Sequence, residues 1–401
     1  MQKKNILLVS LVVLLVGFVL IATVSGLFTP ASKQTVTKIG IIMPLSGDAA
    51  GLGDELSKSL ELAKSEINKD QNKIEFIYED GKCDSKEAAN AASKLVNIDK
   101  VDYIIGGFCS SEVLGAAPII ESSKVIMLSP SGSSQEITNA GDYVFRLIPS
   151  DSYLAQKVSE EMVNQKITKV AIIYENEAYS KALADTFKAE YLKDSNNKIV
   201  LEEGYMSTEN DFRTIVTKVI ASNPQAVYLI PNSTGKATLR LILNEFQANN
   251  YKPKIFTNEM IALPEIVSEY PELVEGAIYP QYNINDKDPV TLEYSNKLKS
   301  LYGQDFPNQL PLSYSAYTYD SVYVIAEAID HCKEDTECAK AYLYSIKDKH
   351  MTSGTVTFDS YGDVQSSYIF NTIRNGTVVI YNWFLFSFFI YSLAIFHIIS
   401  K

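Results

Sequence analysis

The sequence predicts an α/β protein in which two doubly wound lobes are each built around a parallel β-sheet. Three observations carry this prediction. Strand-like apolar runs alternate with helix-like segments, the alternation starts again after residue 150, and 401 residues are enough for more than one domain. With 46% hydrophobic and 21% charged residues, the chain can bury a sizeable core and is not globally disordered.

The first series runs from residue 38 to residue 149. Its first predicted helix shows a clear apolar stripe, with Leu56, Leu60, Ala63 and Ile67 at helical spacing. The strands are expected at 38–45, 74–80, 101–107, 125–130 and 143–149, with helices at 54–68, 85–98 and 111–122.

The second series has the same alternation and is followed by a different ending. Its strands are expected at 170–176, 199–206, 226–231, 254–259 and 276–282, with helices at 152–165, 180–195, 211–222 and 234–248. Two further helices at 290–301 and 313–330 precede strands near the C-terminus, where Asn375 and Gly376 mark a hairpin turn. Periodicity alone does not assign this last part to either lobe.

The N-terminal segment, residues 1–28, is predicted to be a membrane anchor or a signal peptide. Residues 6–28 carry no charge, follow Lys3 and Lys4, and are long enough to cross a bilayer. A signal peptide has a shorter apolar region of ~7–15 residues, so we favour an uncleaved anchor over cleavage near Thr23 and Ser25. No cysteine follows for a lipid anchor, and the two lysines place the rest of the chain outside.

The C-terminal segment 383–400 is uncharged, aromatic-rich and just long enough to span a membrane. A helix that is apolar on every side has no face for solvent, so a transmembrane segment is the preferred interpretation. A buried terminal helix and a frameshifted or divergent tail are the alternatives.

Charge and motif content exclude several classes of protein. A net charge of −12 argues against nucleic-acid binding, for which a basic surface is expected. No phosphate-binding loop or Ser/His/Asp arrangement is recognisable, so we expect neither an enzyme nor a cofactor. Only three histidines are present, and none has the spacing of a metal site.

The four cysteines are expected to form disulfides, since the count is even and the chain is predicted to lie outside the membrane. Their spacing suggests the pairs Cys83–Cys109 and Cys332–Cys338, one of three connectivities.

Polar side chains gather where predicted strands of the first lobe meet helices. Ser110 follows one strand, and the run from Ser131 to Ser134 follows another, with Glu136 completing an S-x-x-E capping box from Ser133. A helix N-terminus offers free N–H groups and partial positive charge, and serine hydroxyls add donors. These turns therefore suit a carboxylate, although simple helix capping explains either cluster alone.

Three residues take the equivalent place in the second lobe. Tyr179, Asn232 and Glu259 each follow a predicted strand, and ligands of doubly wound sheets bind beyond the carboxyl ends of the strands. Glu259 can pair with an ammonium group. A carboxylate-binding helix end on one lobe and this acid on the other would together hold the backbone of an amino acid.

Six stretches carry a resemblance to a known family. They are KIGIIMPLSGDAAGLGDE, YEDGKCDSKEAANAASKLV, VDYIIGGFCSSEVLGAAP, MLSPSGS, GDYVFRLIPSD and VTFDSYGDV. Over about residues 38–381 the chain resembles the type I periplasmic binding proteins, in particular the leucine/isoleucine/valine-binding branch. The resemblance implies two lobes joined by three crossovers, which close around a small ligand by hinge motion.

The resemblance also implies lobe boundaries. The first lobe would comprise 38–149 and 280–364 and the second 150–279 and 365–381, after a linker at 29–37. The crossovers would lie near 149–150, near 278–281 and after 364.

Site roles follow from the same resemblance. Ser110 and Ser133 would bind the ligand carboxylate. The backbone carbonyl of Ser131 and the carboxylate of Glu259 would bind the ligand ammonium, and Tyr179 would cover the ligand. The Cys83–Cys109 bridge would hold the turn that presents Ser110. Two further positions depart from the family pattern, because Leu52 and Asn232 stand where aromatic residues are usual. The ligand is therefore expected to be an amino acid, with a branched aliphatic side chain or a smaller, longer or more polar one.

The function expected from these features is that of an extracellular or periplasmic solute-binding protein of an ABC importer. It would be anchored to the membrane and would deliver an amino acid to permease subunits. The alternative is a membrane-anchored, receptor-like ectodomain that signals through a partner. A hydrolase using Ser110 or Ser133 is disfavoured, because no histidine is placed to act as its base.

Overall fold

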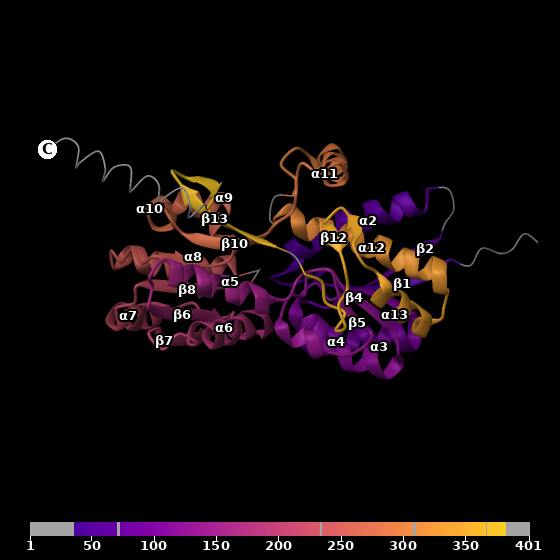
Figure 1. Ribbon diagram of the computed structural model, residues 1–401, viewed down its shortest axis with the longest axis horizontal. Coiled ribbons are helices and arrows are strands. Elements are labelled where there is room, and N and C mark those ends of the chain that lie inside the picture. The colour runs from indigo at the N-terminus through magenta and orange to yellow at the C-terminus, as the bar shows by residue number, and fades with distance from the viewer. Residues whose placement is uncertain (1–35, 70–72, 233–234, 308–309, 366, 382–401) are drawn as a thin grey trace, which may run out of the picture. The chain divides into compact units, whose positions relative to one another are not determined.

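A computed structural model of the protein describes residues 36–69, 73–232, 235–307, 310–365 and 367–381. All but the first two of these residues belong to one compact unit that begins at Lys38. Within this unit the strands form two main sheets and a small two-stranded one (Figure 1).

The first sheet has five strands in the order β2-β1-β3-β4-β5. Strands β1, β3, β4 and β5 pair in parallel, as the alternation of strands and helices predicts. The strands are β1 (Thr37–Met43), β2 (Ile74–Asp80), β3 (Tyr103–Gly106), β4 (Ile126–Ser129) and β5 (Val144–Arg146), and the helices between them are α2 (Ala50–Ile67), α3 (Ser85–Lys94) and α4 (Ser110–Ser123).

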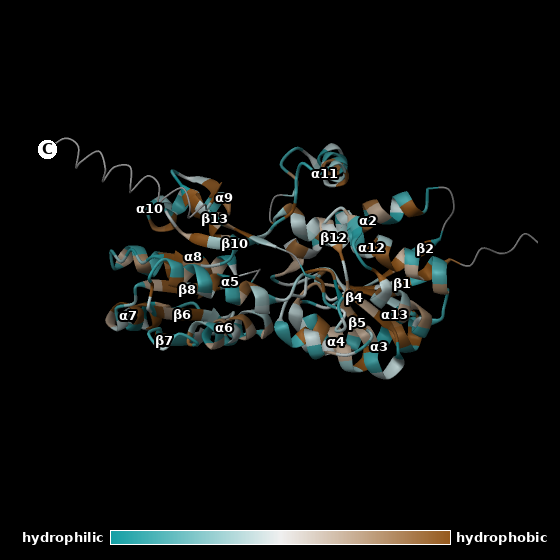
Figure 2. Ribbon diagram, in the orientation of Figure 1, coloured by the Kyte–Doolittle hydropathy of each residue, from teal (hydrophilic) through white to brown (hydrophobic). Residues whose placement is uncertain are grey.

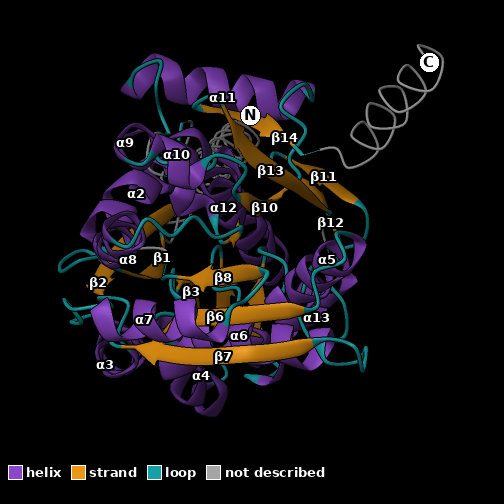
Figure 3. Ribbon diagram, turned by 90° about the vertical axis from the view of Figure 1, so that its left-hand side faces the viewer, coloured by secondary structure: helices purple, strands orange, loops and turns teal. Residues whose placement is uncertain are grey.

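The second sheet has seven strands in the order β14-β13-β10-β9-β8-β6-β7. Its neighbours from β7 to β10 pair in parallel, and Figure 3 shows β6 and β7 side by side with α6 and α7 beside them. The strands are β6 (Lys169–Glu175), β7 (Lys198–Tyr205), β8 (Ala226–Ile230), β9 (Ile255–Phe256), β10 (Ile278–Tyr282), β13 (Tyr368–Arg374) and β14 (Thr377–Ile380). The helices of this half are α5 (Asp151–Asn164), α6 (Ala178–Tyr191), α7 (Arg213–Ser222), α8 (Lys236–Ala248), α9 (Pro264–Glu269) and α10 (Pro271–Val274).

One edge of the second sheet is antiparallel and contains the hairpin that the sequence predicts. Strands β13 and β14 pair antiparallel to each other, and β13 is antiparallel to β10. The physical reason is the predicted hairpin: Asn375 and Gly376 have φ of 50° and 72°, which suits a two-residue turn that reverses the chain.

The structure also assigns the helices that periodicity left open. Helices α11 (Pro289–Tyr302), α12 (Leu312–Cys332) and α13 (Thr336–Ser345) contribute buried residues to the same hydrophobic core as the first sheet. In Figure 1 the orange α12 lies beside the indigo α2, although the two helices are far apart in sequence. The short strands β11 (Lys349–Met351) and β12 (Gly354–Val356) follow α13.

The hydrophobic cores divide the elements into two sets. The first set, which is the first sheet with α2 to α4, α11 to α13, β11 and β12, shares one core, and the second set, which is the second sheet with α5 to α10, has a core on each face of its sheet. Successive residues of β6 point to opposite faces of the second sheet, so Ala171 and Ile173 join one core and Val170 and Ile172 another. In Figure 2 much of the ribbon of the strands is brown, which marks hydrophobic residues. Three connections join elements of the two sets: β5 to α5, β10 to α11, and β12 to β13. The lobe boundaries given above remain a prediction.

Neither predicted membrane segment can be compared with the structure. Residues 6–28 and 383–400 both lie outside the described residues. Among the helices that the structure does describe, none is long and apolar enough to cross a bilayer.

Candidate functional site

All seven ligand-binding residues predicted from the sequence line one cavity at the carboxyl ends of the parallel strands. They are Leu52, Ser110, Ser131, Ser133, Tyr179, Asn232 and Glu259. Six of them lie in the loops or at the helix starts that follow β3 and β4 of the first sheet and β6, β8 and β9 of the second. Phe108, Cys109, Glu177, Leu310 and Tyr314 complete the lining.

The turn that leads into α4 is organised by a buried acid that the sequence analysis did not single out. Glu112 accepts hydrogen bonds from the backbone N–H groups of Phe108 (2.8 Å), Cys109 (3.1 Å) and Cys83 (3.0 Å). Burial nevertheless raises its pKa to about 7. A Cβ at Gly107 would lie 2.2 Å from the Glu112 Cβ, so only glycine fits there. This network holds Ser110 at the start of the helix.

The structure joins the cysteines as Cys83–Cys109 and Cys332–Cys338. The first bridge ties the loop before α3 to the residue that precedes Ser110, with Cα atoms 5.2 Å apart. The second joins the end of α12 to α13 and does not line the cavity.

The loop after β4 that contains residues 131–134, here called the serine loop, packs against the turn that leads into α4. Ser131 donates its hydroxyl to the carbonyl of Phe108 at 2.7 Å, and the backbone N–H of Ser134 donates to Ser110 Oγ at 3.1 Å. The predicted capping box at Ser133 is wrong, because Ser134 Oγ accepts the N–H of Glu136 at 3.3 Å. Ser133 instead stands one residue before the cap and lines the cavity.

Arg146 supports this loop and was also missed in the sequence. Its side chain is fully buried, and its Nη1 atom donates to the carbonyls of Ser133 at 3.0 Å and Ser134 at 2.7 Å. Nε and Nη2 each donate to Asp363 at 2.6 Å. Asp363 lies on the connection from β12 to β13. A charged residue in the otherwise buried strand sequence YVFRLIP is the signal that would have identified it.

In the second set of elements, Tyr179 and Asn232 are both held by glutamates. Glu177 caps α6 by accepting the N–H groups of Tyr179 (2.9 Å) and Ser180 (2.6 Å), and burial raises its pKa. Glu175 accepts the N–H of Asn232 at 3.3 Å.

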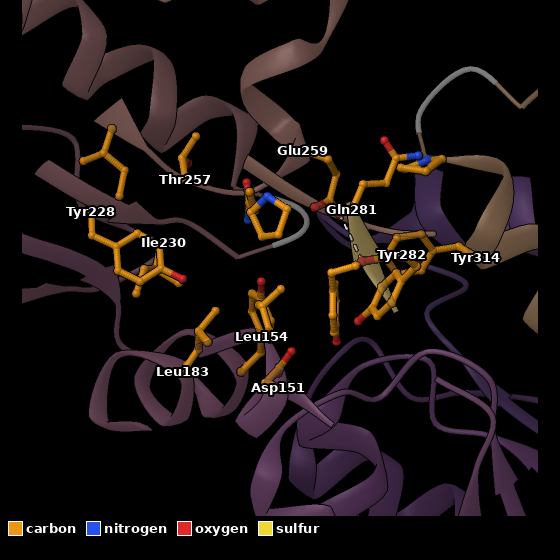
Figure 4. A pocket seen from close by; sticks show the side chains of 16 residues that line it. Asp151, Leu154, Leu183, Tyr228, Ile230, Thr257, Glu259, Gln281, Tyr282 and Tyr314 are labelled. Atoms are coloured by element: carbon orange, nitrogen blue, oxygen red, sulfur yellow. Dashed lines mark hydrogen bonds between the residues drawn. The ribbon is translucent and has the colours of Figure 1, made fainter. Parts of the chain in front are cut away.

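Glu259 receives a hydrogen bond from the other set of elements. The hydroxyl of Tyr314, on α12, donates to Glu259 Oε1 at 3.1 Å (Figure 4). Burial raises the pKa of Glu259, and this hydrogen bond works in the opposite direction. An ammonium group beside Glu259 would favour its ionised form.

The cavity has two chemically different sides. None of the described residues that line it is Lys or Arg, so an anionic group would depend on the serine hydroxyls and the free N–H groups of α4. Glu259 and Glu177 supply negative charge for a cation. The described residues contain no cluster of His, Cys, Asp and Glu that could hold a metal ion. The arrangement therefore suits a zwitterion.

Comparison with known proteins identifies the family of the chain. The sequence profile described as periplasmic binding protein matches residues 36–377. The chain belongs to this family. Membership of a family of binding proteins confirms the expectation that the chain is not an enzyme, and it confirms the resemblance to the periplasmic binding proteins.

Relatives of this periplasmic binding protein include two curated proteins. An amino acid binding protein of Pseudomonas aeruginosa is 31% identical over 214 residues, which cover 52% of this chain and 56% of that protein. The Leu/Ile/Val-binding protein of Escherichia coli is 25% identical over 349 residues, 85% of this chain and 92% of the relative.

A solved structure shares the fold. The branched-chain amino acid transporter substrate binding protein of Streptococcus pneumoniae, in complex with isoleucine, superposes with a TM-score of 0.74 at 23% identity. The match covers 86% of this chain and 100% of that one.

Proposed function

We propose that the protein is the solute-binding component of an ABC importer and that it binds an amino acid in the cavity described above. One observation carries this proposal: the serine turns at the start of α4 and after β4 share a single cavity with Glu259, and no Lys or Arg is among its described lining residues. Donors without net charge on one side and a carboxylate on the other match the two ends of an amino acid.

In the proposed pose the ligand carboxylate lies against Ser110, Ser133 and the free N–H groups at the start of α4. The ligand ammonium lies between the backbone carbonyl of Ser131 and the carboxylate of Glu259. The ring of Tyr179 covers the ligand from the second lobe. Closure of two lobes around this ligand would occur at the three connections between the sheets.

The names of the relatives support an amino acid and leave its side chain to be determined. The Escherichia coli relative is named for leucine, isoleucine and valine, and the Streptococcus pneumoniae structure contains isoleucine. Leu52 and Asn232 line the cavity in this chain at positions where an aromatic wall is usual in the family. The proposed ligand is therefore a branched-chain amino acid or a related small amino acid.

We place the protein at the extracellular or periplasmic face of the membrane, with importer permease subunits as partners. The apolar segment at residues 6–28 supports a membrane anchor or signal peptide, and the apolar segment at 383–400 supports a second membrane segment.

The lobes proposed are 38–149 with 280–364 and 150–279 with 365–381. A membrane-anchored ectodomain that signals through a partner would use the same cavity.

Isothermal titration of the full-length chain in mild detergent against the twenty amino acids tests the proposal. We expect micromolar or tighter binding of one or a few, and at least a tenfold loss of affinity in Glu259→Ala, since a buried charged partner is removed. Glu334→Ala, which removes an exposed carboxylate away from the cavity, is the matched control and should bind like the wild type. No binding by any amino acid would refute the proposal.

A further inference from the structure

A groove of about 400 Å³ lies on the second sheet, away from the ligand cavity. Its lining residues lie at the end of α5, at the amino ends of β6, β9 and β10, and at the end of β13. The ligand cavity lies beyond the carboxyl ends of the parallel strands. The groove and the cavity therefore occupy opposite ends of the same strands.

The groove is basic, although the chain as a whole is acidic, with 48 Asp and Glu against 36 Lys and Arg. Lys166, Lys254 and Arg374 line it, and none of the lining residues that the structure describes is Asp or Glu. Two acids act on these cations from nearby: Glu275 lies 3.6 Å from Arg374, and Glu161 favours the charged form of Lys254. Burial nevertheless lowers the pKa of Lys254, and the charge of Arg374 lowers it further. An anion in this basic groove would relieve the repulsion between the two cations.

Strand β14 lies beside the basic groove and exposes apolar side chains. It is the edge strand of the second sheet and pairs with β13 (Figure 3). Val378, Val379 and Ile380 are 42%, 39% and 60% exposed. Arg374 at the end of β13 and Tyr381 directly after β14 both line the groove, so the groove and the strand form one continuous surface. An exposed apolar edge strand is a site at which a protein associates with another surface.

The sequence that follows this surface indicates what covers it. The apolar segment 383–400 begins two positions after Tyr381, and two residues reach at most about 7 Å. With that segment in a bilayer, Tyr381 and the basic groove stand at the level of the lipid headgroups. Tyrosine is enriched at this level of the membrane, and cations beside a membrane segment are attracted to anionic lipids.

We infer that this surface docks on the membrane, with the basic groove binding the phosphate of an anionic phospholipid and the exposed side chains of β14 contacting the lipid. The inference rests on the membrane segment proposed above for residues 383–400. A second copy of the chain is a poorer occupant, because two copies paired through β14 would bring their basic grooves together. Docking in this way would hold the second sheet at the membrane and turn the ligand cavity, at the other end of the strands, away from it.

Native mass spectrometry of the full-length chain, released from a nonionic detergent, tests the inference because it counts bound lipids and copies of the chain together. The probe is dioctanoyl phosphatidylglycerol, and dioctanoyl phosphatidylcholine is the matched zwitterionic lipid. We expect phosphatidylglycerol to bind roughly tenfold more tightly, since only this lipid has a net negative charge to offer the groove.

The double variant Lys166→Gln with Lys254→Gln tests the groove itself. We expect its preference for phosphatidylglycerol to fall below about threefold, because two of the three cations are removed. Lys181→Gln with Lys218→Gln removes the same charge from exposed positions on α6 and α7 outside the groove and should keep the preference. Thermal unfolding followed by circular dichroism checks that each variant is folded.

Hydrogen exchange in vesicles tests the contact of β14 with the membrane. We expect the amides of residues 377–380 to exchange more slowly in vesicles that contain phosphatidylglycerol than in vesicles of phosphatidylcholine alone. The Lys166→Gln, Lys254→Gln variant should lose this difference, whereas the control variant should keep it.

Four results would overturn the inference: equal binding of the two lipids, an unchanged preference in the groove variant, complete displacement of the lipid by inorganic phosphate, or a dimer that binds no lipid. The third would indicate a site for a free anion, and the fourth would indicate that β14 pairs with a second copy. Amino acid binding is measured separately by isothermal titration. A chain that binds amino acids but no lipid overturns the inference and keeps the binding function, and the reverse result keeps the inference and refutes that function.

Discussion

Variants of the buried pair Arg146 and Asp363 distinguish two roles of this pair. One is to stabilise the fold, and the other is to hold the serine loop in place for ligand binding. Asp363 accepts two hydrogen bonds of 2.6 Å from Arg146 and one of 2.7 Å from Thr138. Asp363→Ala leaves the guanidinium in the core without its counter-ion. Breaking a buried ion pair by removing one partner costs about 3–5 kcal/mol, and the complete burial of Arg146 places this case in that range.

The double variant Arg146→Met with Asp363→Leu removes both charges. We expect its unfolding free energy to return to within about 1–2 kcal/mol of the wild type, because replacing a buried pair by apolar residues is often close to neutral. The carbonyls of Ser133 and Ser134 then lose the donors that Arg146 provides and keep only the backbone N–H groups of Asp151 and Ile137. Affinity for the amino acid ligand should fall at least tenfold in this stable protein.

Urea unfolding at pH 7, followed by far-UV circular dichroism, measures the first effect, and isothermal titration measures the second. Asp211→Ala is the control: it breaks an exposed Arg–Asp pair, and exposed pairs contribute little. The reasoning is refuted if Asp363→Ala lowers the unfolding free energy by less than about 1 kcal/mol. It is also refuted if the double variant is as unstable as the single one, or if it binds ligand like the wild type.

Two further predictions concern stability. Burial raises the pKa of Asp151 from 3.8 to about 7, so ionisation of this carboxyl group destabilises the folded protein increasingly as pH rises through this interval. Asp151→Asn should therefore stabilise the protein by at most about 4 kcal/mol at pH 8 and by less at pH 5. Thermal unfolding at the two pH values measures this, and a gain in melting temperature that does not depend on pH would contradict it. Removing the Cys83–Cys109 disulfide, whose cysteines are 26 positions apart, should lower the unfolding free energy by roughly 3–4 kcal/mol, and removing Cys332–Cys338, with a separation of 6, by roughly 2 kcal/mol. Urea unfolding of the two double alanine variants measures both losses, and equal losses would exclude the chain-entropy explanation.

Much of the fold and the main cavity followed from local patterns in the sequence. Alternating strands and helices predict parallel sheets, and parallel strands bring their carboxyl ends to one edge. Ser110, Ser133, Tyr179 and Glu259 each follow a strand, so their placement at this edge required no knowledge of long-range contacts. The resemblance to a family then predicted which of these residues would contact one ligand, and all of them line one cavity.

Other features depend on contacts between distant parts of the chain, and only the tertiary structure decided them. The pattern of α12 shows an apolar helix but does not say which core it joins, and its Tyr314 supplies the hydrogen bond to Glu259. Arg146 and Asp363 are 217 positions apart, so neither residue predicts the other.

Asp151 shows the same limit most clearly. In sequence it is an ordinary acidic residue at the start of a helix, where such residues are common. Its pKa is nevertheless raised to about 7, because the elements packed around it bury it almost completely. Local sequence determines where a side chain sits along its element, whereas hydrogen-bond satisfaction is a property of all the elements that pack around it.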